Sequence, residues 1–173
     1  MNILCWNSRG AVCTKFRSTV MDLVRSHHID VLFVCEPRIS GPKALAVIKS
    51  LGFSCFELLW NDAKVKLDII GTSDQSISAC LSWQGQKPWL FSAIYARPCN
   101  VKKEKLWEYL NFVASCHQMP WLLAGDFNDI LQAEDKVGGV SSCKLTSMKK
   151  WFDAVEAQKI QGWAQINFRP KTI

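Results

Sequence analysis

The sequence predicts a single α/β domain in which two packed sheets carry helices on their outer faces. The chain has 173 residues, which is enough for one domain and short for two. Continuous apolar runs, typical of buried strands, alternate with segments of helical periodicity. Two further segments alternate apolar and polar residues, as half-exposed antiparallel strands do. Because no repeat or linker separates these elements, we expect stacked layers around one core.

The first elements are two buried strands with a helix between them. Residues 2–6 are apolar and stop at a turn over residues 7–10. Apolar side chains recur at helical spacing from Lys15 to His28. The apolar, β-branched run 31–35 predicts a strand covered on both faces. Pro37 ends this strand, because a proline restricts the residue before it.

The middle of the chain predicts a short helix and two half-exposed strands. The helix is expected from Pro42 to about Leu51, whereas residues 53–60 fit neither periodicity. Residues 65–70 and 76–82 alternate apolar and polar side chains, so one face of each strand should be half-exposed. The side chains expected to point inward are Val65, Leu67, Ile69, Ile77, Ala79 and Leu81.

The last elements are two buried strands and two amphipathic helices. Residues 89–94 and 120–124 predict the strands, and the second stops at Gly125. One helix is expected from Lys102 to about His117 and the other from Lys144 to about Ala157. Their inward stripes are Leu106, Leu110 and Val113, and Leu145, Met148, Phe152 and Val155.

Composition narrows the compartment and the partners. The eight cysteines form no CxxC pair, and several lie in apolar runs, so we expect buried thiols in a reducing compartment rather than disulfides or zinc ligands. No apolar run approaches a membrane span, and the N-terminus lacks the basic start of a signal peptide. These features predict an intracellular protein, nuclear or cytoplasmic and not secreted. A net charge of +6 favours polyanionic partners.

A polar residue follows each of four apolar strands. These residues are Asn7, Glu36, Tyr95 and Asp126. Each alone is compatible with an ordinary turn or a solvated strand end. Together they indicate one rim of the sheets, where two carboxylates and an amide suit Mg²⁺. Such a cation neutralises a scissile phosphate and helps to generate a nucleophilic water.

Four ordered segments carry a family resemblance: Ile3–Gly10, Val31–Pro37, Ala93–Pro98 and Trp121–Asp129, which contains Gly-Asp-Phe-Asn. Residues 58–61, 106–110 and 135–139 add to it. By these segments the chain resembles the endonuclease/exonuclease/phosphatase superfamily, and most closely the apurinic-like endonuclease domain of plant LINE (non-LTR) retrotransposons. The resemblance implies a DNase I-like, four-layer α/β sandwich with mostly antiparallel sheets over residues 1–157, followed by a divergent tail over 158–173.

The resemblance also implies residue roles. Glu36 and Asn7 resemble the metal site, with Mg²⁺ or Mn²⁺ as cofactor, and Tyr95 resembles the tyrosine that touches the scissile phosphate. Asp126 resembles the acid that orients or deprotonates the attacking water. Asn128 resembles the amide that positions this water and binds a phosphate oxygen. The implied partner is DNA; no protein partner is indicated.

The chain departs from the family pattern in two respects. Arg9 lies where some relatives have an acid, so it is a candidate phosphate contact or a turn cap. The family's late Ser-Asp-His motif is missing, since the three histidines are His27, His28 and His117. The resemblance therefore predicts a domain without its last strands, marginally stable, and weakly active or inactive.

Three functions fit these observations. The first is a Mg²⁺-dependent endonuclease of retrotransposon origin, impaired by the loss of Ser-Asp-His. The second is a non-catalytic remnant that still binds nucleic acid. The third is a small-substrate phosphatase of the same fold, because fold alone does not select the substrate.

Overall fold

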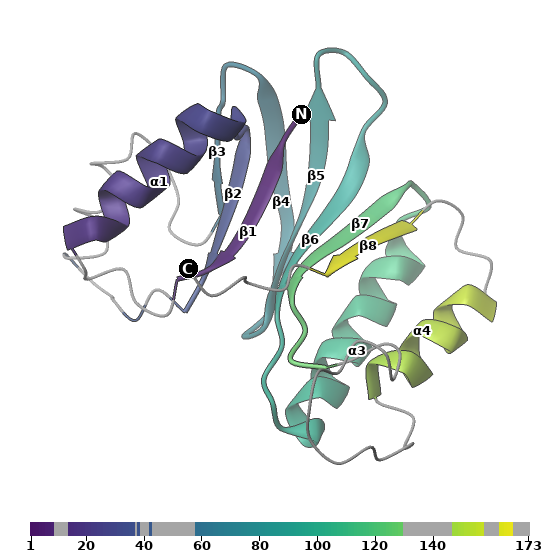
Figure 1. Ribbon diagram of the computed structural model, residues 1–173. Coiled ribbons are helices and arrows are strands. Elements are labelled where there is room, and N and C mark those ends of the chain that lie inside the picture. Colours follow the sequence, from purple (N-terminus) through teal and green to yellow (C-terminus); the bar gives the residue numbers. More distant parts are fainter. Residues whose placement is uncertain are drawn as a thin grey trace.

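In the computed structural model the chain forms two sheets that pack against each other, with helices outside (Figure 1). The structure describes residues 1–8, 14–36, 38, 42, 58–129, 147–157 and 163–167. The described elements are β1 (Ile3–Asn7), α1 (Thr14–His27), β2 (Val31–Cys35), β3 (Leu58–Trp60), β4 (Val65–Thr72), β5 (Ser76–Trp83), β6 (Trp89–Tyr95), α3 (Asn100–Cys116), β7 (Trp121–Asp126), α4 (Ser147–Ala157) and β8 (Trp163–Asn167). The sheet orders are β1-β2-β3 and β4-β5-β6-β7-β8. The expected α/β sandwich is thereby confirmed.

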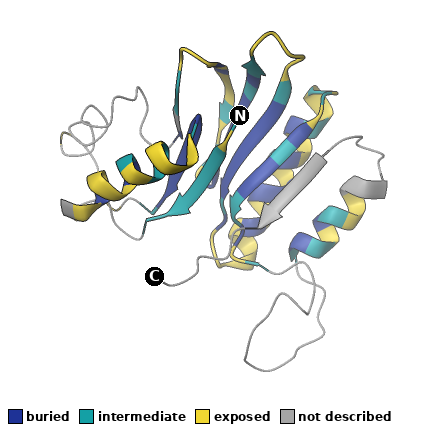
Figure 2. Cartoon of the chain, turned by 45° about the horizontal axis from the view of Figure 1, so that its top comes forward, coloured by how far each residue is buried: buried dark blue, intermediate teal, exposed yellow. Residues whose placement is uncertain are grey.

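Three apolar clusters separate the layers. Between the sheets, β2 side chains such as Phe33 pack against β5 and β6 side chains such as Phe91. On the outer face of the first sheet, α1 buries Phe16 and Val20 against β2. On the outer face of the second sheet, α3 buries its expected stripe, and α4 buries Met148 and Trp151, against β6 and β7. In α4, Trp151 is buried where Phe152 was expected, and Phe152 is only half-buried. The side chains of Leu145 and Val155 lie outside the described part of the chain. Figure 2 shows the result, with the central strands largely buried and the outer side of α1 exposed.

Two parallel crossovers bring strand ends to one edge. Helix α1 connects β1 to β2, which run parallel with Asn7 opposite Cys35. Helix α3 connects β6 to β7, which run parallel with Tyr95 opposite Asp126. Parallel strands require such long crossovers. Because the β7–β8 pair is also parallel, three of the six described strand pairs are parallel, where mainly antiparallel pairs were expected.

The observed elements match the expected ones closely, but two strand faces differ. The polar face of β5 is buried, because Ser78 and Ser92 lie beneath the helices of the second sheet with their hydroxyls 2.7 Å apart. Trp121 Nε1 donates to the same Ser92 hydroxyl at 3.0 Å, so this buried pair is satisfied. In β4 the strand register shifts between Ile69 and Gly71, and this irregularity leaves Ile69 44% exposed instead of inward.

The expectations for the cysteines and for the C-terminal tail were partly wrong. Cys35 is buried and Cys5 half-buried, as apolar runs predict, but Cys99 and Cys116 are exposed at the ends of α3, so burial of all the thiols was wrong. The tail contributes β8, which pairs with β7 and had not been expected. Arg9 and the helix expected from residue 42 to 51, except Pro42, lie outside the described residues. No helix in the described part of the chain is long and apolar enough to cross a bilayer.

Candidate active site

Asn7 links the two acids predicted from the strand ends. Its Nδ2 donates to Asp126 Oδ2 at 3.1 Å and lies 3.5 Å from Glu36 Oε1. The first contact joins residues 119 positions apart and crosses from one sheet to the other. The end of β1 therefore places one amide between carboxylates from β2 and β7.

Glu36 is the most contacted acid of this cluster. The Tyr95 hydroxyl donates to its Oε1 at 2.5 Å, and Arg38 Nη2 pairs with its Oε2 at 3.1 Å. The Tyr95 hydrogen bond, aided by Arg38 and Asn7, lowers the pKa of Glu36. The same hydrogen bond and desolvation raise the pKa of Tyr95 to about 12. At neutral pH the cluster therefore holds a carboxylate at Glu36 and a protonated hydroxyl at Tyr95.

The backbone at Glu36 is strained. Its φ is +48°, and Arg38 follows with a φ of +50°. A non-glycine residue in this region costs about 1–3 kcal/mol, and such strain concentrates at functional sites. In this backbone conformation the Glu36 carboxylate accepts the hydrogen bond from the Tyr95 hydroxyl.

The loop after β7 is tied to β6. Asp126 Oδ1 accepts the Asn128 backbone N–H at 3.0 Å, and the Asp126 carbonyl accepts the Ala96 N–H at 2.8 Å. Asn128 adopts a φ of +45°, which asparagine tolerates better than most residues. Its Nδ2 donates to the Ala96 carbonyl at 2.8 Å, so one amide hydrogen stays available.

Lys103 supports this loop from α3, a role that the sequence pattern did not predict. The residue is 3% exposed, and its Nζ donates to the Asn128 carbonyl at 2.5 Å and pairs with Asp129 at 3.1 Å. Asp129 Oδ2 also accepts Ser147 Oγ and the Met148 N–H at the start of α4. The sequence could have indicated this role, because Lys103 lies at helical spacing from the buried residues Leu106 and Leu110 of α3.

The donor chemistry of this cluster fits a hard divalent cation. Glu36 and Asp126 supply carboxylate oxygens, and Mg²⁺ is commonly held by one or two carboxylates with water and phosphate completing its shell. Asn7 presents its N–H side to both acids, so its amide would have to turn to offer oxygen. Within the described residues, no group of three His, Cys, Asp or Glu side chains could hold a metal.

The nearby thiols do not offer an alternative. Burial raises the pKa of Cys5 to about 12 and also raises the pKa of Cys35. Both thiols are therefore protonated at neutral pH, whereas zinc ligands and nucleophiles are thiolates. The groups of this cluster that could bind a cation are therefore the carboxylate oxygens of Glu36 and Asp126, and not the thiols.

The histidines lie away from the cluster. Asn2, at the opposite end of β1 from Asn7, donates to the backbone carbonyls of His27 and His28. His117 lies between α3 and β7. It is therefore near the first residue of β7, whereas Asp126 is the last residue of that strand. The structure thus brings together Asn7, Glu36, Tyr95, Asp126 and Asn128 without a histidine.

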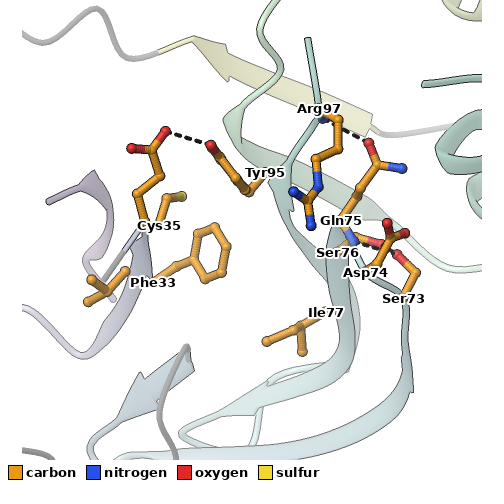
Figure 3. A pocket seen from close by; sticks show the side chains of 11 residues that line it. Phe33, Cys35, Ser73, Asp74, Gln75, Ser76, Ile77, Tyr95 and Arg97 are labelled. Carbon is orange, nitrogen blue, oxygen red and sulfur yellow. Dashed lines mark hydrogen bonds between the residues drawn. The ribbon is translucent and has the colours of Figure 1, made fainter. Parts of the chain in front are cut away.

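A pocket of about 210 Å³ adjoins this cluster (Figure 3). Glu36 and Tyr95 form the wall that it shares with the cluster. Its other walls are the end of β2 and residues 73–77, with Arg97 on the segment that follows β6. A substrate held at Glu36 and Tyr95 would therefore reach this pocket.

Comparison with known proteins yields structural relatives only. No family model and no curated protein matches the chain. The structure resembles D. rerio TDP2 humanized by 14 mutations, with a TM-score of 0.52 and 16% identity over 74% of this chain and 66% of that one. It also resembles truncated Caenorhabditis elegans TDP2, with a TM-score of 0.50 and 15% identity over 80% and 65%. This chain spans about two thirds of the length of each of these two TDP2 chains. TDP2 is a member of the endonuclease/exonuclease/phosphatase superfamily, and the likeness shows that this chain has the DNase I-like fold.

Proposed function

We propose that this chain is a divalent-metal phosphodiesterase acting on DNA, with its site at Asn7, Glu36, Tyr95, Asp126 and Asn128. One observation carries the proposal: carboxylates from both sheets meet at one edge, where Asn7 contacts both of them and Tyr95 donates to Glu36. The net charge of +6 suits a polyanionic substrate. The four segments that resemble LINE endonucleases support DNA as the substrate and a retrotransposon origin.

Each side chain has a defined task in this reaction. Glu36, with Asn7 and Asp126 nearby, would hold Mg²⁺, which supplies charge neutralisation at the scissile phosphate. The protonated Tyr95 hydroxyl donates to a phosphate oxygen. Asp126 accepts a proton from the attacking water, and the remaining amide hydrogen of Asn128 donates to a phosphate oxygen. Fixed donors of this kind stabilise charge as it develops in the transition state.

The cluster supplies no histidine to protonate the leaving group, and this observation favours a second candidate function. Tyr95, with a pKa of about 12, is a weak proton donor. We therefore expect slow hydrolysis at best, and the alternative is a remnant that binds DNA without cutting it. Phosphate contacts release counterions, so such binding would weaken steeply with salt.

The test is nicking of supercoiled plasmid by purified protein with Mg²⁺. Asp126→Ala should reduce nicking by about 10²–10⁴-fold, the usual contribution of a general base. Asp22→Ala removes an exposed acid on α1 and should leave nicking unchanged.

Two results would decide against hydrolysis. Equal nicking by the wild-type chain and Asp126→Ala would show that this cluster does not cut DNA. Salt-sensitive binding without nicking would establish the remnant instead.

A further inference from the structure

A buried glutamine, Gln75, anchors one wall of the pocket beside Tyr95 and Glu36. This glutamine is 3% exposed. Its backbone carbonyl accepts a hydrogen bond from the Tyr95 backbone N–H at 2.8 Å. In its side chain, Oε1 accepts the Arg97 backbone N–H at 2.8 Å, and Nε2 donates to the Lys102 backbone carbonyl at 2.7 Å. Gln75 thereby fastens the β4–β5 turn to the segment that carries Tyr95 and Arg97.

The turn itself is also fixed internally. The Ser73 hydroxyl accepts the Gln75 N–H at 3.1 Å and lies 2.8 Å from the Ser76 hydroxyl. Both faces of the pocket are consequently anchored before any ligand arrives. A pre-formed pocket avoids the entropy of ordering its walls when it binds.

The size of the pocket selects a small group. Its volume of about 210 Å³ is below the roughly 300–1,000 Å³ of pockets that enclose drug-sized ligands. Apolar Phe33 and Ile77 line it together with exposed, oppositely charged Asp74 and Arg97. Such a lining suits a compact group with an apolar body and a negative charge, as in a phosphorylated sugar.

Arg97 supplies a positive charge that favours a phosphorylated ligand in this pocket. Its side chain is exposed and forms no ion pair with any residue that the structure describes. In Figure 3 its guanidinium extends from the segment after Tyr95 toward the interior of the pocket. A guanidinium can donate two parallel hydrogen bonds to phosphate, which gives geometric selectivity as well as affinity.

We propose that this pocket is a subsite for the sugar of one nucleotide, with one of its phosphates at Tyr95 and Glu36 and its second phosphate bound by Arg97. Asp74 accepts a hydrogen bond from a donor group of the same nucleotide. The inference rests on the proposed function, because it needs a phosphoester at Tyr95 and Glu36. It defines the substrate as a nucleotide phosphorylated on both sides, as inside a nucleic-acid strand.

Calorimetry with deoxyadenosine 3′,5′-bisphosphate and the matching 3′- and 5′-monophosphates, all with Mg²⁺, tests this subsite. These probes contain no diester, so they report binding without the proposed hydrolysis. The wild-type chain should bind the bisphosphate about tenfold more tightly than either monophosphate, the ratio expected for one charge-assisted contact. Arg97→Gln should abolish that preference, whereas Arg25→Gln, a change on the exposed end of α1, should preserve it.

The outcomes separate the subsite from the reaction. Equal affinities of the wild-type chain for all three probes, absence of binding, or an unchanged preference in Arg97→Gln would each overturn the subsite. Plasmid nicking that depends on Asp126 would then still support the proposed function. A preference that depends on Arg97, without any nicking, would support the subsite and refute the hydrolytic function.

Discussion

Replacement of Lys103 by methionine removes a buried charge while keeping the length of the side chain. The side chains of Lys103 and Asp129 are 4% and 10% exposed. Removing one partner from such a pair costs about 3–5 kcal/mol, because the other charge stays buried without compensation. Asp129 would keep two donors, Ser147 Oγ and the Met148 N–H, so we expect the lower end of this range, about 3 kcal/mol.

Urea denaturation followed by tryptophan fluorescence measures this loss. Trp107 and Trp151 stack with their ring centroids 5.1 Å apart between α3 and α4, so unfolding changes their environment. In thermal unfolding, about 3 kcal/mol should lower Tm by roughly 6–12 °C for a chain of this length. Lys105→Met is the matched control, because Lys105 is exposed on the same helix.

The comparison between the two lysines decides the result. An exposed substitution normally changes the free energy of unfolding by less than about 0.5 kcal/mol. If Lys103→Met were no more destabilising than Lys105→Met, the ion pair with Asp129 would not hold the loop of Asn128, and the support assigned to Lys103 would be wrong.

Two further changes probe the site and its scaffold. The pKa of Tyr95 is raised from 10.0 to about 12, so its stabilising contribution is complete below pH 10 and disappears as pH rises through 12. Wild-type stability should therefore fall across this window, and Tyr95→Phe should lack that component while Tyr109→Phe retains it, as pH-dependent denaturation would show; identical profiles for the two variants would contradict the Glu36 hydrogen bond. Gly125 has a φ of +143°, and an added Cβ would lie 2.0 Å from the Ile94 carbonyl oxygen, so Gly125→Ala should separate β6 from β7. Gly85→Ala, also at positive φ but without neighbours within 4 Å, should cost only about 1–2 kcal/mol, and equal costs in thermal melts would disprove the steric reason.

Local sequence determined most of the elements and the choice of candidate site residues, although it did not indicate β8. The apolar run 31–35 predicts β2 to the residue, because a strand buried on both faces needs apolar side chains throughout. The strand-end pattern likewise selects Asn7, Glu36, Tyr95 and Asp126, and the structure joins all four by hydrogen bonds. Both inferences depend on residues that are neighbours in the chain.

Tertiary structure decided which distant residues meet. Burial of the β5 serines, the ion pair of Lys103 and the anchoring role of Gln75 depend on which layer covers each face. Apolar periodicity in the sequence predicts that one face of an element is buried, but it does not show which other element covers that face. The partner of a polar residue on a buried face lies elsewhere in the chain, so local sequence does not identify it. The contact of Asn7 with Asp126 spans 119 positions, because two parallel crossovers bring their strand ends to one edge.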